Sequence, residues 1–339
     1  MPKCCVIEGD GIGHEVIPVA LAVLLQVVPD LEAVPAEAGW DCCQQKGVSV
    51  PDETLAAIRE CGAALFGAVS SPSYKVAGYR SAIITMRQAL DLYANIRPVQ
   101  SMPGLSPRPG IDLVVVRENT EGMYAGRERL EGETAIAERV ISRAASRRIG
   151  LRALQLARSA GRKGHSTIVH KANVLPVTDG LFRSSVYEVI KESGTDQDGI
   201  KVDELLVDNA AYQLVSAPEQ FDVIVTTNLF GDILSDAAAY WCGGMGMAPS
   251  LNWGEGAAIA EPVHGSAPDI AGKGIANPLA AILSAALLAR YAWGLEEPAG
   301  RIEAAVRAAL AKEIQLEGNH IGKNNTTTSI TQAVLAHLD

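Results

Sequence analysis

The chain has 339 residues, a formal net charge of −10 at pH 7, 48% hydrophobic residues and 20% charged residues. This composition excludes wholesale disorder, and the length favours two domains. The negative charge argues against a general role in gripping nucleic acid or an anionic membrane, and the 5% aromatic content argues against base-stacking surfaces.

The cysteines and the apolar segments indicate a soluble cytoplasmic protein. None of the six cysteines belongs to a Cys-x-x-Cys pair, so we expect free thiols in a reducing compartment. The apolar run near the start is too short for a signal peptide. The longest apolar stretch, around residues 279–289, is shorter than the ~18 residues of a membrane span.

In chain order, the first hundred residues alternate predicted strands and helices. A short apolar strand at residues 6–7 leads through a glycine turn at 9–13 into a helix over 16–28. Residues 65–69 predict a buried strand, and residues 87–93 predict a helix. Three prolines and two glycines in residues 101–110 mark a connection between two units.

The rest of the chain continues the alternation. The β-branched run at 111–116 predicts a central strand. Residues 138–163 predict a helix, and Arg139, Arg143 and Arg147 are spaced so that they would form one solvated face of it. Further strands are expected at 167–170, 201–207 and 221–226, and further helices at 232–240, 276–291 and 299–312. Together these elements predict the α/β class.

The glycine turn superficially suggests nucleotide binding. The dinucleotide fingerprint is G-x-G-x-x-G, however, and its sixth position is His14 in this chain. Taken alone, the turn predicts a joint between a strand and a helix.

Asp232 and Asp236 form the most informative local pattern. At i,i+4 spacing a helix places both carboxylates on one face, where they repel each other unless a cation lies between them. Oxygen ligands without nearby Cys or His favour Mg²⁺ or Mn²⁺ over zinc, and Asp208 could supply a third carboxylate. The alternative is two solvated aspartates that stabilise the start of a helix.

Arginines at the ends of apolar segments form a second pattern. Arg87, Arg97 and Arg117 could clamp a di- or tricarboxylic substrate, because a guanidinium matches a carboxylate through two hydrogen bonds. Lys171 is a candidate base and Tyr124 a candidate acid. Each of these residues alone is also compatible with a surface or packing role.

Six segments together resemble one family, the metal-dependent β-decarboxylating 2-hydroxyacid dehydrogenases. They are GDGIGHE, LDLYANIRP, RENTEG, HKANVLP, TTNLFGDILSD and EPVHGSAPDIAGKGIANP, in the family's order and spacing between residues 9 and 278. The resemblance implies the two-domain isopropylmalate dehydrogenase-like α/β fold rather than a Rossmann fold, with the active site in the cleft between domains. It implies a first domain of residues 1–100 and 249–339 on the cofactor side, and a second domain of 101–248 with the metal site and the dimer contact.

The same resemblance implies roles for individual residues. Asp232 and Asp236 would hold Mg²⁺ or Mn²⁺ together with Asp208 of the partner subunit in a homodimer with shared sites; a tetramer also stays open. Lys171 of the partner subunit would assist deprotonation of the substrate hydroxyl, and Tyr124 would protonate the enol carbon after CO₂ is lost. The substrate carboxylates would meet Ser71, Arg87, Arg97 and Arg117, and Asn173 would lie near nicotinamide and substrate.

The cofactor implied by the resemblance is NAD. Family members that use NADP carry Lys and Tyr where this chain has Asp269 and Ile270, and a carboxylate accepts hydrogen bonds from ribose hydroxyls while it repels a 2′-phosphate. The full set of expected cofactor residues is Val69, Ser70, Ser71, Asn173, Glu261, His264, Gly265, Ser266, Ala267, Asp269, Ile270 and Asn277.

The residues before Arg87 bear on the substrate. Ser81 with Ile83 and Ile84 resembles homoisocitrate dehydrogenases, in which an apolar wall would accommodate one extra methylene. The expected reaction is oxidation of homoisocitrate to 2-oxoadipate and CO₂, on the aminoadipate route to lysine. Isocitrate and 3-isopropylmalate are the alternative substrates, and a methylene supplies only ~1–3 kcal/mol of discrimination. A non-catalytic regulatory subunit is the alternative of another class.

Overall fold

The computed structural model describes residues 1–72, 76, 78–194 and 199–338. The chain divides into two compact units: unit 1 comprises Met1–Leu92, Ser101–Pro109 and Tyr240–Asp339, and unit 2 comprises Tyr93–Gln100 and Gly110–Ala239. This division differs from the expected boundaries at residues 93–109 and 240–248. Residues 94–100 belong to unit 2 because they pair along their whole length with the strand at 112–118.

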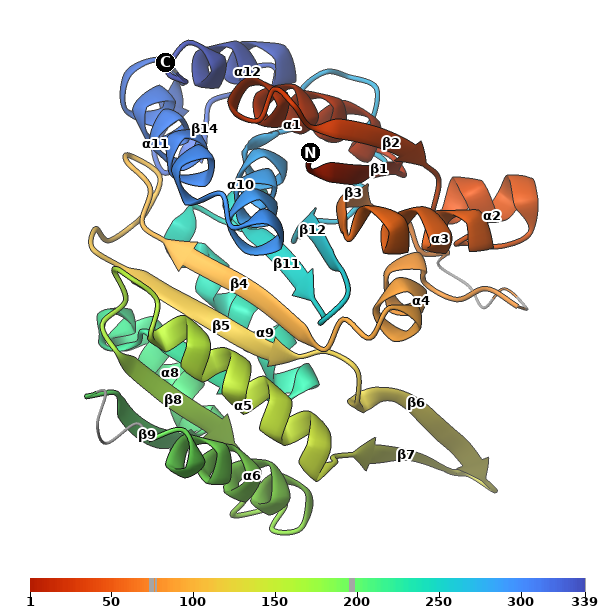
Figure 1. Cartoon of the computed structure of the whole chain (residues 1–339), viewed down its shortest axis with the longest axis vertical. Coiled ribbons are helices and arrows are strands. Elements are labelled where there is room, and N and C mark those ends of the chain that lie inside the picture. Colours follow the sequence, from red (N-terminus) through yellow and green to blue (C-terminus); the bar gives the residue numbers. More distant parts are fainter. Residues whose placement is uncertain (73–75, 77, 195–198, 339) are drawn as a thin grey trace. The chain divides into compact units, whose positions relative to one another are not determined.

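Unit 1 holds both ends of the described chain (Figure 1). Its elements are β1 Lys3–Gly9, α1 Gly13–Val27, β2 Glu32–Ala36, α2 Trp40–Lys46, α3 Asp52–Cys61, β3 Ala63–Ala68, α4 Ala82–Ala89, β11 Pro249–Trp253, β12 Ala258–Pro262, α10 Leu279–Trp293, α11 Glu296–Lys312, β13 Leu316–Glu317, β14 His320–Ile321 and α12 Thr327–Leu335.

The sheet of unit 1 joins its strands in the order β2-β1-β3-β12-β11. All neighbours are parallel except β11 and β12. Helix α10 packs against β12 and β3 on one side and against α1 and α11 on the others. Its residues 279–289 are all buried, which explains why nearly every residue of this stretch is apolar, on all faces of the helix.

Unit 2 is built around a second run of strands in the order β4-β5-β10-β8-β9, parallel except for the β4–β5 pair. Helices α5 and α9 both pack against β5 and β10. Its elements are β4 Ala94–Gln100, β5 Asp112–Glu118, β6 Gly122–Glu131, β7 Thr134–Val140, α5 Arg143–Ala157, β8 His165–His170, α6 Thr178–Glu192, β9 Lys201–Leu206, α8 Val207–Ser216, β10 Val223–Thr226 and α9 Asn228–Ala238.

The α/β class is confirmed, and so are the predicted strands at 111–116, 167–170, 201–207 and 221–226, to within two residues at most ends. The helix expected at 87–93 is wrong. Helix α4 ends at Ala89, and Asp91 has a left-handed backbone with φ of 46°, which a continuing helix does not allow. Arg97 therefore lies inside strand β4 and does not directly follow the end of a helix in the sequence.

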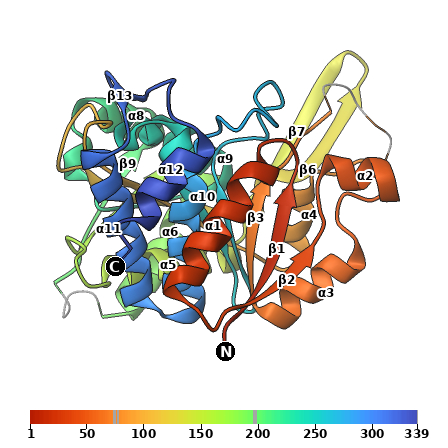
Figure 2. The ribbon, with the colours of Figure 1, turned by 90° about the horizontal axis from the view of Figure 1, so that it is seen from above.

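The helix expected from residue 138 is also wrong at its start. Residues 134–140 form strand β7, which pairs with β6 in a separate antiparallel hairpin, and α5 begins only at Arg143. The hairpin extends away from the other elements of unit 2 (Figure 2). Arg139 consequently does not share a solvated helix face with Arg143 and Arg147; its side chain is only 13% exposed.

Two further features match the sequence. All six cysteines are free thiols, and burial raises the pKa of Cys4, Cys5 and Cys242 to about 12. Among the described residues, no helix combines the length and the apolar character needed to cross a membrane.

Candidate active site

The glycine turn of unit 1 is a site of close backbone approach. A side chain at Gly9 would collide with the carbonyl of Ala68, and one at Gly11 with the carbonyl of Ser266. The backbone N–H of Ile12 donates to that Ser266 carbonyl at 2.9 Å. The turn is thus a joint between strand and helix, as its sequence predicts, and it also holds the segment that carries several expected cofactor residues.

Asp10 sits at the centre of this turn and is buried. Its carboxylate accepts hydrogen bonds from the backbone N–H groups of Trp40 at 2.8 Å, Asp41 at 3.0 Å and Ser70 at 2.7 Å. The Ser70 hydroxyl in turn donates to the Ser266 hydroxyl at 2.8 Å. Asp10, which the sequence reasoning did not single out, thus holds Ser70, and Ser70 contacts Ser266, a second expected cofactor residue.

The other expected cofactor residues differ in exposure. Gly265 and Asp269 are exposed, Ala267 and Ile270 are partly buried, and Ala267 has a left-handed backbone. Burial lowers the pKa of His264. Val69 packs partly against the core of unit 1, and Ser71 is exposed.

Both the nitrogen and the oxygen of the Asn277 side-chain amide form hydrogen bonds with the backbone. Its Nδ2 donates to the Gly246 carbonyl at 3.0 Å, and its Oδ1 accepts from the backbone N–H of Leu279 at 3.0 Å. The second bond satisfies an N–H group at the start of α10.

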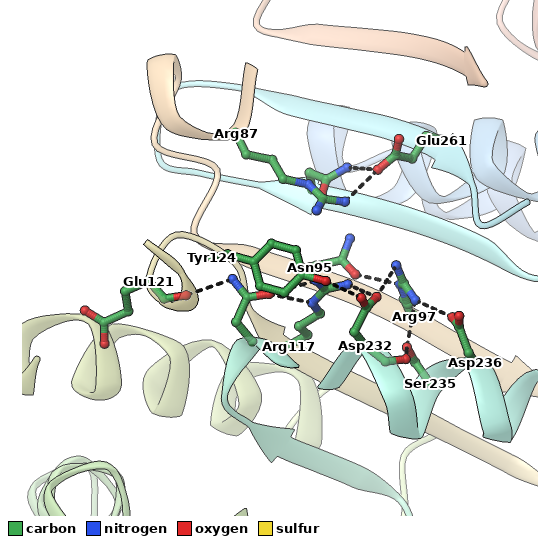
Figure 3. Close-up of polar contacts among 12 residues, drawn as sticks. Arg87, Asn95, Arg97, Arg117, Glu121, Tyr124, Asp232, Ser235, Asp236 and Glu261 are labelled. Carbon is green, nitrogen blue, oxygen red and sulfur yellow. Dashed lines mark hydrogen bonds and ion pairs between the residues drawn. The ribbon is translucent and has the colours of Figure 1, made fainter. Parts of the chain in front are cut away.

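Arg87 is held in unit 1 by polar side chains from β11 and β12. Its guanidinium donates to Asn252 Oδ1 at 2.9 Å and to Glu261 Oε1 at 3.0 Å, and Asn252 also donates to Glu261 at 2.7 Å (Figure 3). The structure thus joins an expected substrate residue, Arg87, to an expected cofactor residue, Glu261.

Helix α4 carries the expected substrate-selecting residues. Ser81 is its N-cap, and Ile83 and Ile84 are partly buried in its first turn. Ile83 packs partly against the core of unit 1. Ile84 lies about 100° farther round the helix, because successive helical residues are rotated by that angle.

In unit 2, two buried arginines meet the aspartates of α9. Arg97 on β4 donates to Ser235 and to Asp236, each at 2.8 Å, and to Asn95 at 2.8 Å, and its other nitrogen lies 3.5 Å from Asp232 (Figure 3). The two aspartates lie on one face of α9, as their i,i+4 spacing predicts.

Arg117 on β5 is 1% exposed and also pairs with Asp232, while its remaining nitrogens donate to Asn228 at 2.7 and 3.0 Å. The Tyr124 hydroxyl donates to the other oxygen of Asp232 at 2.5 Å, and the Arg117 guanidinium lies 5.1 Å from the centre of the Tyr124 ring. Burial and then the hydrogen bond to Asp232 raise the pKa of Tyr124. Burial raises the pKa of Asp236, and the nearby Arg97 opposes that rise.

The α9 aspartates fit a hard divalent cation by their chemistry. They offer carboxylate oxygens, and the side chains of Asp232 and Asp236 are 30% and 46% exposed, so each can reach a ligand. Within the described residues of one chain, no group of three or more His, Cys, Asp and Glu side chains is arranged so that it could hold a metal ion.

Lys171 and Asp208 form a separate pair in unit 2. The Lys171 ammonium donates to Asp208 at 2.5 Å, and this hydrogen bond lowers the pKa of Asp208. Asp208 lies in the first turn of α8 and is exposed, and Asn173 is exposed in the turn after β8. The structure thus joins two residues that are expected to serve the partner's site.

Sequence reasoning missed the side chains that hold the arginines. Asn95, Asn228 and Ser235 all lie inside the segments that carry the family resemblance, but the residue type alone gave no reason to select them. Asn252 lies outside those segments, and its role depends on the pairing of β11 with β12.

The family model for isocitrate/isopropylmalate dehydrogenases matches residues 3–334. The isocitrate/homoisocitrate dehydrogenase of Thermus thermophilus is 54% identical over 99% of this chain and 98% of its own length. The homoisocitrate dehydrogenase of Methanocaldococcus jannaschii is 49% identical over 91% of this chain and 90% of its own length. The 3-isopropylmalate/3-methylmalate dehydrogenase of the same organism is 46% identical over 98% of both chains.

The fold agrees with these relatives. The crystal structure of isocitrate dehydrogenase from Methylococcus capsulatus matches with a TM-score of 0.92 and 40% identity, over 100% of this chain and 99% of that one. Members of the family are generally dimeric and depend on NAD(P) and a divalent metal ion. The chain belongs to the isocitrate/isopropylmalate dehydrogenase family, a family of decarboxylating hydroxyacid dehydrogenases.

Proposed function

We propose that the protein is an NAD- and Mg²⁺- or Mn²⁺-dependent homoisocitrate dehydrogenase that forms 2-oxoadipate and CO₂ on the aminoadipate route to lysine, in the cytoplasm. The observation that carries the proposal is the α9 cluster, in which Asp232 and Asp236 meet Arg97, Arg117 and Tyr124. Relatives named for isocitrate/homoisocitrate and homoisocitrate, at 54% and 49% identity, support this substrate.

The metal would be held by Asp232 and Asp236, with Asp208 supplied by a second copy. When bound, a divalent cation polarises the substrate's oxygens and stabilises the enolate that follows loss of CO₂. Arg97 and Arg117 contribute before any ligand arrives, because they fix both carboxylates on the exposed side of α9. Their positive charges also favour a polycarboxylate substrate.

Lys171 and Tyr124 would move the protons. Lys171, as the neutral amine, would accept the proton of the substrate hydroxyl while the hydride leaves for the nicotinamide ring of NAD. The ammonium so formed would pair with Asp208, which lies within hydrogen-bond distance of it. The Tyr124 hydroxyl would deliver a proton to the carbon that has lost CO₂, since its hydrogen bond to Asp232 aims it at the metal-binding face.

Asp269 would select NAD. It is exposed in the segment that follows the Ser70–Ser266 contact, so a ribose can reach its carboxylate. This residue would discriminate NAD from NADP in two ways. Its carboxylate would accept hydrogen bonds from both ribose hydroxyls, and it would repel a 2′-phosphate. The position of the active site in a cleft remains a prediction from the family resemblance.

A homodimer would complete the site. Among the described residues of one chain, Asp208 pairs with Lys171, and no third His, Cys, Asp or Glu side chain joins the α9 pair in a group that could hold a metal ion. Tyr212 and Val215 on α8 and Ile233 on α9 are large apolar side chains exposed by 59–70%, and α8 packs against α9. Exposed apolar side chains on two adjacent helices support a partner surface there.

Isocitrate and 3-isopropylmalate are the second candidates. Relatives named for 3-isopropylmalate are 44–46% identical to this chain, so their identity is only slightly lower than that of the relatives named for homoisocitrate. The partly buried Ile83 and Ile84 favour a substrate with an additional methylene.

The test is NADH formation at 340 nm by the purified chain with Mg²⁺, with homoisocitrate, isocitrate and 3-isopropylmalate supplied separately. We expect the highest kcat/KM for homoisocitrate and measurable turnover of isocitrate. A higher kcat/KM for either alternative would overturn the substrate and keep the reaction class. Absence of turnover with all three, together with activation of a second dehydrogenase subunit, would identify a regulatory subunit.

A further inference from the structure

Arg139 and Asp179 form a buried ion pair outside the cluster described above. Arg139 lies near the end of β7, and Asp179 lies in the first turn of α6. The Asp179 side chain is 0% exposed and that of Arg139 is 13% exposed. Neither residue belongs to the groups expected to touch substrate, cofactor or metal.

One side of this pair holds the turn that carries Lys171. The second carboxylate oxygen of Asp179 accepts a hydrogen bond from the backbone N–H of Lys171 at 2.6 Å. The backbone N–H of Asp179 itself donates to the carbonyl of Leu175 at 3.0 Å, which closes the turn between β8 and α6. Asp179 thereby fixes the point from which the Lys171 side chain reaches Asp208.

The other side holds the start of α9. A second nitrogen of Arg139 donates to the hydroxyl of Thr227 at 2.8 Å, and Thr227 is the buried N-cap residue of α9. The guanidinium also lies 4.8 Å from the centre of the Phe230 ring, in the first turn of the same helix. Arg139 therefore contacts the N-terminal end of the helix that carries Asp232 and Asp236.

Stability alone is a weak reason for such a pair. Removing two charges from water has a large free-energy cost, and apolar residues of similar volume often serve a core equally well. An ion pair with directional bonds to both a lysine turn and a helix start instead fixes the geometry of two segments at once.

We propose that Arg139 and Asp179 are positioning residues that set Lys171 and the α9 carboxylates in a fixed relation within each chain. The inference rests on the proposed function, because it presumes that Lys171 and the α9 aspartates serve the reaction. Their action is through other residues, not through contact with the substrate.

The chain offers a matched control in the same arginine series. Arg143 pairs with Glu188 at 2.5 Å, and this pair is solvent-exposed, with the side chains 56% and 38% exposed. Arg143→Gln removes the same charge from the same unit without touching Lys171 or α9.

The experiment compares Arg139→Gln, Asp179→Asn, Arg143→Gln and Arg139→Lys in the full-length protein. For each, kcat, the KM for NAD, the melting temperature and hydrogen exchange of the peptide covering residues 170–175 are measured. We expect the first two variants to lose about tenfold to a hundredfold in kcat with an unchanged KM for NAD, because small misplacements of reacting groups have effects of that size. Exchange at 170–175 should accelerate in both, Arg143→Gln should match wild type, and Arg139→Lys should recover part of kcat.

A lower melting temperature with wild-type kcat and wild-type exchange at 170–175 would overturn the inference and leave the pair a structural one. If the wild-type chain turns over none of the three acids, the proposed function fails on its own. The exchange measurement then still decides whether the pair orders the Lys171 turn, since it needs no substrate.

Discussion

The two units use arginines differently. In unit 1, Arg87 and its partner Glu261 are both nearly buried, and one positive charge meets one negative charge. In unit 2, the buried Arg97 and Arg117 meet Asp232 and Asp236, whose side chains remain 30% and 46% exposed. A buried ion pair stabilises the structure but has no free face for a ligand. Carboxylates that are fixed by buried arginines and are still partly exposed to solvent can bind one. On the proposed function, unit 2 would therefore present the reacting groups, and unit 1 would present residues that choose the substrate and bind the cofactor.

The largest effect is expected from Asp232→Asn. Loss of a metal carboxylate should remove tight Mn²⁺ binding and lower kcat by more than about a hundredfold, because a catalytic metal ion supplies several kcal/mol of charge stabilisation. Mn²⁺ titration by electron paramagnetic resonance, together with initial rates, measures both. The control in unit 1 is Glu261→Gln, which should bind Mn²⁺ as wild type does; weakened Mn²⁺ binding in this control would break the distinction between the units.

The two arginine clusters should also differ in stability. Arg87→Leu leaves the nearly buried Glu261 carboxylate without its charge partner, and breaking a buried pair costs about 3–5 kcal/mol. Arg117→Leu should cost less, because Asp232 is partly exposed and keeps Arg97 and Tyr124 as neighbours. Urea unfolding midpoints compare them. Arg87→Leu combined with Glu261→Leu should recover stability, and a double variant as unstable as the single one would show that the pair itself is not responsible.

The smallest effect concerns substrate choice in unit 1. Ile84→Ala should lower the preference for homoisocitrate over isocitrate by about tenfold, since a methylene contact supplies ~1–3 kcal/mol of discrimination. Ile83→Ala is the matched variant and should also lower the melting temperature, because Ile83 packs against the core. Ratios of kcat/KM for the two acids measure the preference. Unchanged ratios in both variants would mean that neither isoleucine faces the substrate.

Sequence reasoning predicted the α/β class, the main strands and the shared helix face of Asp232 and Asp236, because each of these depends on local periodicity. It could not place Arg139, since the i,i+4 spacing of three arginines suits a helix and the hairpin partner β6 lies several residues away in sequence. It also missed Asp10 and Asp179. Asp10 accepts hydrogen bonds from backbone N–H groups of distant segments, and Asp179 pairs with the side chain of Arg139 on a distant strand. Contacts of that kind are set by tertiary structure and leave no spacing to detect.

On the proposed function, each active site combines the α9 carboxylates of one chain with Lys171 and Asp208 of a second copy. Lys171→Ala and Asp232→Asn should each be inactive alone. Co-refolding equal amounts of the two should restore about one quarter of the wild-type rate, because half of the dimers are mixed and each mixed dimer contains one intact site. A mixed preparation that forms mixed dimers, shown by differently tagged chains eluting together, and yet stays inactive would contradict the claim.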